Sequence, residues 1–308
     1  MTELPTQELH HLQTEQSNTA SQQIDCLSAV EIARLMNTED ATVATVVGTQ
    51  LEQIGAAIDG IVARMEQGGR LIYIGAGTSG RLGVLDASEC PPTFSTDPAQ
   101  VVGQLAGGMR ALTHATERLE DDAQAGADAI AELDVCALDS VAGLTASGRT
   151  PFVLGAMDAA RERGAFTIGI ACNAPSLLHE HVEIMIAPVT GPEIVAGSTR
   201  LKAGTAQKMV LNMLSTGTMI KLGKTFGNLM VDVKASNAKL QERAIRIVAE
   251  ATGLPRDEAA VALAAAGGET KTAIVAVLAS VPAGDARAMI ATSRGSIRAA
   301  LGELAPCP

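Results

Sequence analysis

The chain has 308 residues, a length that allows one large domain or two smaller ones with a core that needs no disulfides or metals to be stable. Hydrophobic residues make up 47% of the chain and charged residues 19%, which is a globular composition and excludes a disordered or collagen-like chain. The formal net charge of −11 repels nucleic acid and anionic lipid surfaces, so neither nucleic acid nor a membrane is an expected partner.

The N-terminus and the cysteines indicate a cytoplasmic protein. Residues 1–16 lack the basic start and the apolar core of a secretory signal. The 5 cysteines are spaced singly, without the close pairs of a zinc site or the even count of a disulfide framework, so we expect reduced thiols. Because the chain has 1 tyrosine and no tryptophan, it cannot build an aromatic platform for a sugar or a base, and a polar ligand must be held by hydroxyls, amides and charges.

The first two thirds of the chain predict an α/β fold. Helical spacing of apolar residues runs from about residue 20 to 68, where Gly68 and Gly69 end it, which predicts a helical lead-in. Short apolar runs then alternate with helix-length segments, a pattern typical of a parallel sheet covered by helices. We therefore predict a helical segment at 1–49 and a doubly wound parallel sheet within 50–235, with strands at 71–74, 101–102, 140–144, 166–171 and 184–189.

The rest of the chain is helical in pattern. Helical spacing continues from 205 to 222 and from 234 to 250, and three short Ala-rich stretches separated by Gly and Pro follow. This pattern predicts a small three-helix bundle within 240–308, with a dimer contact or a lid as its expected use.

A glycine-rich loop follows the first predicted strand and opens a helix. Its sequence, GAGTSG at 75–80, fits G-x-G-x-x-G, the turn that lets a pyrophosphate approach a helix N-terminus. The next predicted strand ends in Gly107 and Gly108 and lacks the acidic residue that would bind a ribose hydroxyl. The adjacent hydroxyls of Thr78 and Ser79 suit a phosphate monoester or a sugar instead, and the alternative is a turn that only joins strand to helix.

A second loop of this kind, TASGRTP at 145–151, follows the third predicted strand. Ordinary capping of the next helix by Ser147 or Thr150 is the plainer interpretation of this loop alone. Because parallel sheets bind ligands beyond the carboxyl ends of their strands, the two loops can converge on one phosphorylated ligand. The expected binding residues are Gly77, Thr78, Ser79, Ser147, Gly148 and Thr150.

The two loops resemble the sugar isomerase domain family, and longer blocks are similar to one branch of it, the N-acetylmuramic acid 6-phosphate etherases. These blocks are LIYIGAGTSGRLG at 71–83, LDASECPPT at 85–93, AGTAQK at 203–208, LNMLST at 211–216 and FGNLMVDV at 226–233. The resemblance covers nearly the whole chain. It implies a homodimer and a C-terminal bundle similar to ubiquitin-associated domains, with a packing role.

The resemblance also implies the reaction and its residues. The expected activity is cleavage of the D-lactyl ether at C3 of N-acetylmuramic acid 6-phosphate, giving N-acetylglucosamine 6-phosphate and D-lactate. A base removes the C2 proton alpha to the open-chain aldehyde, an acid protonates the departing oxygen, and water adds back at C3. Matched motifs imply Glu89 as the proton donor to the lactate oxygen and Glu120 as the acid/base partner at C2, with neither a metal nor another cofactor.

Other interpretations stay open. Without the resemblance, Glu89 is a solvated carboxylate at a helix end or turn before Cys90-Pro91-Pro92, and Glu120 only favours a helix dipole. Glu117 is a candidate for binding sugar hydroxyls, one helical turn from Glu120. Two rival functions use the same loops: a non-catalytic sugar phosphate sensor similar to the glucokinase regulatory protein, and an aldose-ketose sugar phosphate isomerase.

Overall fold

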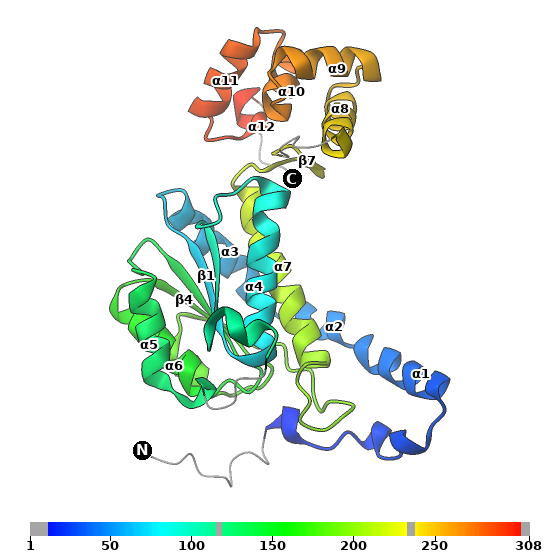
Figure 1. The fold of residues 1–308 in the computed structure, drawn as a ribbon, viewed down its shortest axis with the longest axis vertical. Coiled ribbons are helices and arrows are strands. Elements are labelled where there is room, and N and C mark those ends of the chain that lie inside the picture. Colours follow the sequence, from blue (N-terminus) through cyan, green and yellow to red (C-terminus); the bar gives the residue numbers. More distant parts are fainter. Residues whose placement is uncertain (1–11, 115–118, 233–237, 303–308) are drawn as a thin grey trace. The chain divides into compact units, whose positions relative to one another are not determined.

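The computed structural model describes residues 12–114, 119–232 and 238–302 (Figure 1). The chain forms two compact units, a first unit of residues 1–88 and 99–215 and a second unit of residues 89–98 and 216–308. Two long helices, α4 (Gly77–Phe94) and α7 (Lys202–Lys221), belong to the first unit over most of their length and end in the second. The predicted boundaries at 49 and 235 stay a prediction.

The first unit is built on a five-stranded sheet in the order β2-β1-β3-β4-β5, and every neighbouring pair of strands is parallel. The predicted doubly wound α/β fold is therefore confirmed. The strands are β1 (Leu71–Gly75), β2 (Val101–Leu105), β3 (Ser140–Leu144), β4 (Phe166–Ile170) and β5 (Ile184–Ile186).

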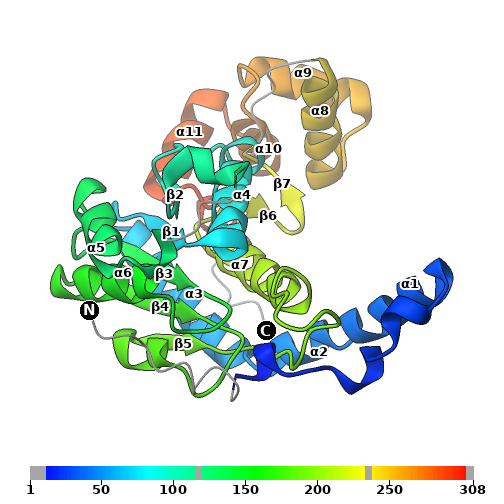
Figure 2. The same cartoon turned by 60° about the horizontal axis from the view of Figure 1, so that its bottom comes forward.

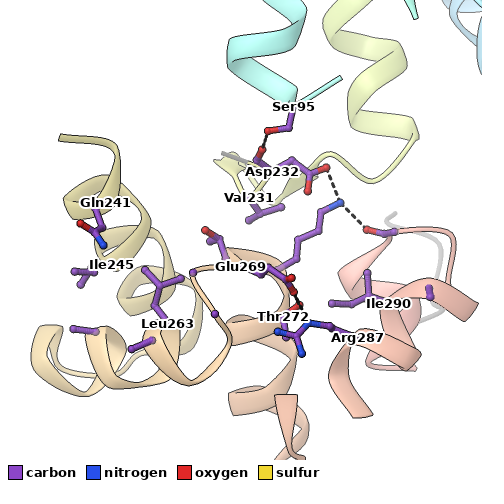
Figure 3. Close-up of a pocket in the computed structure, with 18 residues that line it drawn as sticks. Ser95, Val231, Asp232, Gln241, Ile245, Leu263, Glu269, Thr272, Arg287 and Ile290 are labelled. Carbon is purple, nitrogen blue, oxygen red and sulfur yellow. Dashed lines mark hydrogen bonds and ion pairs between the residues drawn. The ribbon is translucent and has the colours of Figure 1, made fainter. Parts of the chain in front are cut away.

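Helices cover both faces of this sheet, as Figure 2 shows. On one face, α5 (Ala123–Glu132) and α6 (Pro151–Glu162) pack over Ile72, Ile74 and Val141. The other face carries α3 (Leu51–Met65) and the first-unit parts of α4 and α7. Because successive side chains of a strand point to opposite faces, residues 72 and 74 face α5 and α6 and residues 71 and 73 face α4 and α7.

Tyr73 is the polar contact between β1 and the two long helices. Its side chain is fully buried, and its hydroxyl donates to the Asp86 carboxylate of α4 at 2.9 Å and lies 3.4 Å from the Leu211 carbonyl oxygen of α7. Asn212 donates to the other oxygen of Asp86 at 2.6 Å. This network joins β1, α4 and α7 within the first unit.

The helical lead-in contains α1 (Ala29–Asp40) and α2 (Val43–Gly48) before α3, preceded by three short 3-10 turns (η2, Gln13–Glu15; η3, Thr19–Ser21; η4, Ile24–Cys26). A capping box at Ser28 and Glu31 starts α1, in which Glu31 accepts the Ser28 amide at 2.8 Å. None of the residues of α1 is buried, so this helix lacks the packing that stabilises most helices.

The second unit is helical apart from a short hairpin of β6 (Thr225–Phe226) and β7 (Leu229–Met230). The three predicted Ala-rich helices are α9 (Arg256–Ala265), α10 (Thr270–Ala279) and α11 (Ala283–Thr292), flanked by α8 (Ala238–Thr252) and α12 (Ile297–Ala300). Among the described residues no single helix is long and apolar enough to cross a membrane. The helices α9 and α10 have the required length and apolar character only when taken together, and the pair is bent by 108°.

Candidate functional site

The two hydroxyl-rich loops leave neighbouring strands at the same edge of the sheet. β1 and β3 pair in register, so Gly75 at the end of β1 lies beside Leu144 at the end of β3. From β1 the chain crosses to β2 on one side and later returns to β3 on the other side, which makes this the switch point of the sheet. Ligands of doubly wound sheets bind in the crevice at this point.

The first loop is shaped by close backbone contacts. A Cβ atom at Gly80 would lie 2.5 Å from the Gly75 carbonyl oxygen, so only glycine lets β1 and the first turn of α4 approach this closely. The Gly80 amide donates to the Ala76 carbonyl at 3.1 Å, the first hydrogen bond of α4. The amides of Gly77, Thr78 and Ser79 therefore have no acceptor inside the helix and form its positive end, as an anion site requires.

Ser79 in this loop contacts a residue of α7 that the sequence analysis did not single out. The Ser79 hydroxyl lies 2.8 Å from Oε1 of Gln207, and both side chains are buried, at 7% and 1% exposure. Gln207 stands inside the AGTAQK block, but nothing in its spacing marks it, because its partner is 128 residues away. Only the packing of α7 beside α4 brings the two together.

The second loop has a buried hydroxyl at its centre. Oγ1 of Thr145 lies 2.7 Å from Oγ1 of Thr150 and 3.2 Å from Oγ of Ser147, and it accepts the Gly148 amide at 3.3 Å. Thr150 is the N-cap residue of α6, yet its side chain makes no capping hydrogen bond. The capping interpretation of Thr150 is therefore wrong: its hydroxyl is held in a cluster with two others. Thr145, at 2% exposure, was missed by the sequence analysis.

Residues near the N-terminus support the second loop. Asn173, which follows β4, donates to the Ala146 carbonyl and to the Thr14 hydroxyl, each at 3.0 Å. The side-chain oxygen of Asn173, Oδ1, accepts the Thr14 backbone amide at 3.4 Å. Gly148 has a left-handed φ of +73°, and a Cβ atom there would lie 2.3 Å from Cβ of Ser176, so this position of the loop also requires glycine.

The start of α7 is fixed by a buried carboxylate. Glu193, with 0% exposure, accepts the Lys202 and Ala203 amides, each at 2.9 Å, which satisfies two of the free donors of this helix. The Lys202 ammonium lies 2.7 Å from Glu39, and its hydrogen bond lowers the pKa of that carboxyl. Lys202 therefore neutralises an acidic side chain of α1.

Glu89 lies near the C-terminal end of α4, so of the two expected placements, a helix end or a turn, the structure shows the helix end. α4 continues through Pro91 and Pro92 to Phe94. Pro91 and Pro92 have no amide hydrogen, so the carbonyls of residues 87 and 88 lose their helical hydrogen bonds, and α4 ends two residues after Pro92. Glu89 is exposed and belongs to the second unit, whereas both loops belong to the first.

Glu120 is an exposed residue of a 3-10 turn, η6 (Leu119–Asp121), just before α5. The N-cap of α5 is Asp122, which accepts the Ala125 amide at 3.0 Å. η6 packs against α6, and a Cβ atom at Gly155, near the start of α6, would lie 2.0 Å from the Ala123 carbonyl. The structure thus brings Glu120 to the helix that starts at the second loop. Glu117 lies outside the described residues.

No group of three or more His, Cys, Asp or Glu side chains in the described ranges is arranged to hold a metal ion. His181, part of the His179-Glu180-His181 sequence, lies with Nδ1 2.7 Å from the Asp158 carboxylate. Four cysteines, Cys26, Cys90, Cys136 and Cys172, form no disulfide bond, and Cys307 lies outside the described residues.

Comparison with known proteins gives strong similarity along the whole chain. The chain is 56% identical over 294 residues to an N-acetylmuramic acid 6-phosphate etherase of Streptomyces avermitilis, covering 96% of this chain and 94% of the relative. It is 52% identical over 294 residues to the etherase of Klebsiella aerogenes, covering 96% of this chain and 98% of the relative. The chain belongs to the N-acetylmuramic acid 6-phosphate etherase family.

Two family models built on a regulatory protein match parts of this chain. Residues 53–161 match the N-terminal SIS domain of the glucokinase regulatory protein, and residues 227–274 match its C-terminal lid domain. The first match includes both hydroxyl-rich loops, so these loops alone do not separate an etherase from a regulator. Among solved structures, a putative phosphosugar isomerase of Bacteroides fragilis is 17% identical, with a TM-score of 0.49 over 63% of this chain and 91% of that chain.

Proposed function

We propose that this protein is a carbon-oxygen lyase that cleaves the D-lactyl ether of N-acetylmuramic acid 6-phosphate, in the recycling of cell-wall amino sugars. The observation that carries the proposal is its 56% identity to an etherase over 96% of the chain. The hydroxyl-rich loops at the switch point support it, because they offer the donors that a phosphorylated sugar needs.

The phosphate group binds at the two loops. The free amides of Gly77, Thr78 and Ser79 supply the positive end of α4, and the hydroxyls of Ser147 and Thr150 stand at the end of the neighbouring strand. Gly77 has a φ of +53°, and nothing lies within 4 Å of a Cβ atom built there. Amides and hydroxyls can therefore hold the phosphate in a protein whose net charge is negative.

The bond changes are assigned to two carboxyl groups. In the open-chain sugar Glu120 takes the C2 proton, the electron pair forms the C2–C3 double bond, and the C3–O bond breaks. Glu89 gives its proton to the departing lactate oxygen. Water then adds its oxygen to C3 while C2 regains a proton, so the products are N-acetylglucosamine 6-phosphate and D-lactate, and the two carboxyl groups serve without a metal or another cofactor.

The working protein in this proposal is a cytoplasmic homodimer. Reduced thiols suit the cytoplasm, and the described cysteines form no disulfide bond. A second copy packed on α1 would cover the apolar residues Ile32, Leu35 and Met36, which are not buried within one chain. The long helix α7 is less suited to a symmetric contact, because its apolar residues Val210 and Leu214 are already fully buried.

The test is turnover in heavy-oxygen water. Purified, chelator-treated protein is incubated with N-acetylmuramic acid 6-phosphate, and mass spectrometry follows both products. We expect heavy oxygen at the C3 hydroxyl of the sugar and unlabelled D-lactate, because the bond to the sugar carbon breaks and water replaces the ether oxygen there.

The rival functions predict different products. An aldose-ketose isomerase would convert a sugar phosphate without releasing lactate. A sensor would bind the sugar phosphate without turnover, and its two glutamates would then be binding residues. Labelled lactate would place the cleavage on the lactyl side and would contradict the elimination.

A further inference from the structure

Gln207 is a buried polar side chain beside the phosphate loop that the proposed reaction does not use. It is 1% exposed, and Oε1 lies 2.8 Å from the Ser79 hydroxyl. Its Nε2 atom is buried and has no hydrogen-bond partner within the described ranges. A buried amide nitrogen without an acceptor destabilises the folded protein, so its retention needs an explanation.

The position of this amide is held firmly. Gln207 lies five residues after Lys202, whose amide is bound by the buried Glu193 carboxylate at 2.9 Å. A Cβ atom at Gly204 would lie 3.7 Å from Cγ2 of Thr78, so the first turns of α7 pack directly beside the phosphate loop. The amide of Gln207 therefore stays next to Ser79.

Hydrogen counting shows what the amide can do. A serine hydroxyl has one hydrogen. When Oε1 of Gln207 faces Ser79, the Ser79 hydroxyl donates its one hydrogen to Oε1 and cannot donate to a phosphate oxygen as well. A half turn about the last side-chain bond brings Nε2 to the same place, so that Gln207 donates to Ser79 and Ser79 donates to the phosphate.

We propose that Gln207 is a positioning residue for the phosphate group, acting through the direction of the Ser79 hydroxyl hydrogen. In the free protein either orientation leaves one amide atom without a partner, so neither is strongly preferred. A bound phosphate selects the orientation in which Nε2 donates, because only that one gives the anion a hydrogen bond from Ser79. This inference rests on the proposed binding of phosphate at the loops.

The test compares phosphate binding by Gln207→Leu and by wild type. Calorimetric titration with N-acetylglucosamine 6-phosphate, the proposed product, should give a dissociation constant about tenfold to a hundredfold weaker for the variant, the size of one hydrogen bond to a charged group. Thr205→Ala is the matched control, because Thr205 is an exposed residue of the same helix. It should bind as wild type does. In turnover, Gln207→Leu should raise KM far more than it lowers kcat.

A double-mutant cycle separates positioning from a general loss of structure. In a Ser79→Ala background the Gln207→Leu change should weaken binding less than threefold, because the hydroxyl through which it acts is gone. Equal losses in both backgrounds, or wild-type affinity for Gln207→Leu, would overturn the inference. Gln207→Glu supplies the fold check: at neutral pH its carboxylate only accepts from Ser79, so binding stays weak, and binding recovers as the pH falls and the carboxyl can donate.

Failure of the proposed function has a different result. If the protein binds N-acetylglucosamine 6-phosphate and releases no lactate from the substrate, the etherase proposal fails and the titrations still decide the role of Gln207. If wild type binds neither this sugar phosphate nor inorganic phosphate, the loops do not bind phosphate, and the inference falls with them.

Discussion

Glu89 and Glu120 carry different proton transfers in the proposed reaction, so single substitutions should separate the two steps. Glu89→Gln removes the acid that protonates the lactate oxygen and leaves the base in place. We expect lactate release to fall about a hundredfold to ten-thousandfold, the usual contribution of a general acid. Exchange of the C2 proton with heavy water, followed by NMR, should persist. If Glu89→Gln lost C2 proton exchange together with lactate release, then either the roles of Glu89 and Glu120 are exchanged or Glu89 performs both.

The cysteines differ strongly in reactivity. Burial, with a smaller effect of the Glu193 charge, raises the pKa of the Cys172 thiol to about 12. The thiol is therefore protonated at pH 8 and its nucleophilic form is scarce, whereas Cys26 and Cys136 are exposed. Iodoacetamide at pH 8 followed by peptide mass spectrometry should modify Cys26 and Cys136 and leave Cys172 intact. Rapid labelling of Cys172 in the folded protein would contradict its burial.

At the scale of elements, one ion pair fixes the amino-terminal edge of the sheet. Arg70, just before β1, donates through its side chain to both oxygens of Asp139, just before β3, at 2.7 and 3.1 Å. Burial acts to raise the pKa of Asp139, but hydrogen bonds from Arg70 and from the Cys136 amide outweigh it and hold this pKa below its usual value near 3.8. The pair joins the two strands at the edge opposite the phosphate loops.

Asp139→Asn should therefore destabilise the fold in a pH-dependent way. The depressed pKa of Asp139 contributes stability above the unfolded pKa near 3.8, and this stability is lost as the pH falls through the lower folded pKa. At pH 7 we expect a loss of about 1.5 to 3 kcal/mol in the free energy of unfolding. Urea unfolding between pH 2 and pH 7 should show a smaller difference between wild type and variant at the acid end. A constant difference would mean that the charge of Asp139 is not what stabilises the fold.

Much of the fold follows from local pattern, but the site does so only in part. The strands and Ala-rich helices are visible in the sequence because hydrophobic spacing and Gly or Pro stops are local signals. Ser79 and Thr150 stand in recognisable loops after predicted strands. Thr145 and Gln207 were missed because their contacts depend on packing between hydroxyls and between distant helices. A turn at Glu89 was the wrong one of two expected placements, because α4 passes Pro91 and Pro92 and ends only at Phe94.

For the whole molecule, the proposed homodimer has a direct test. Sedimentation velocity should give wild type a mass twice that of one chain. Ile32→Glu with Met36→Glu places two charges on the uncovered face of α1 and should shift the protein toward the mass of one chain. Thr38→Glu, an exposed substitution in the same helix, is the control and should leave the mass unchanged. A wild-type monomer would refute the dimer, and a doubly substituted dimer would show that α1 is not its interface.

The buried Tyr73 gives the protein a built-in optical probe. Because the chain has 1 tyrosine and no tryptophan, ultraviolet emission excited at the tyrosine band comes from Tyr73 alone. Its hydroxyl is bound to the Asp86 carboxylate, a proton acceptor of the kind that quenches tyrosine emission. Brightening of this emission would thus report, without any label, that β1 is separating from α4 and α7. Because the chain absorbs so weakly at 280 nm, a concentration calculated from that absorbance with the coefficient of an average protein would be far too low.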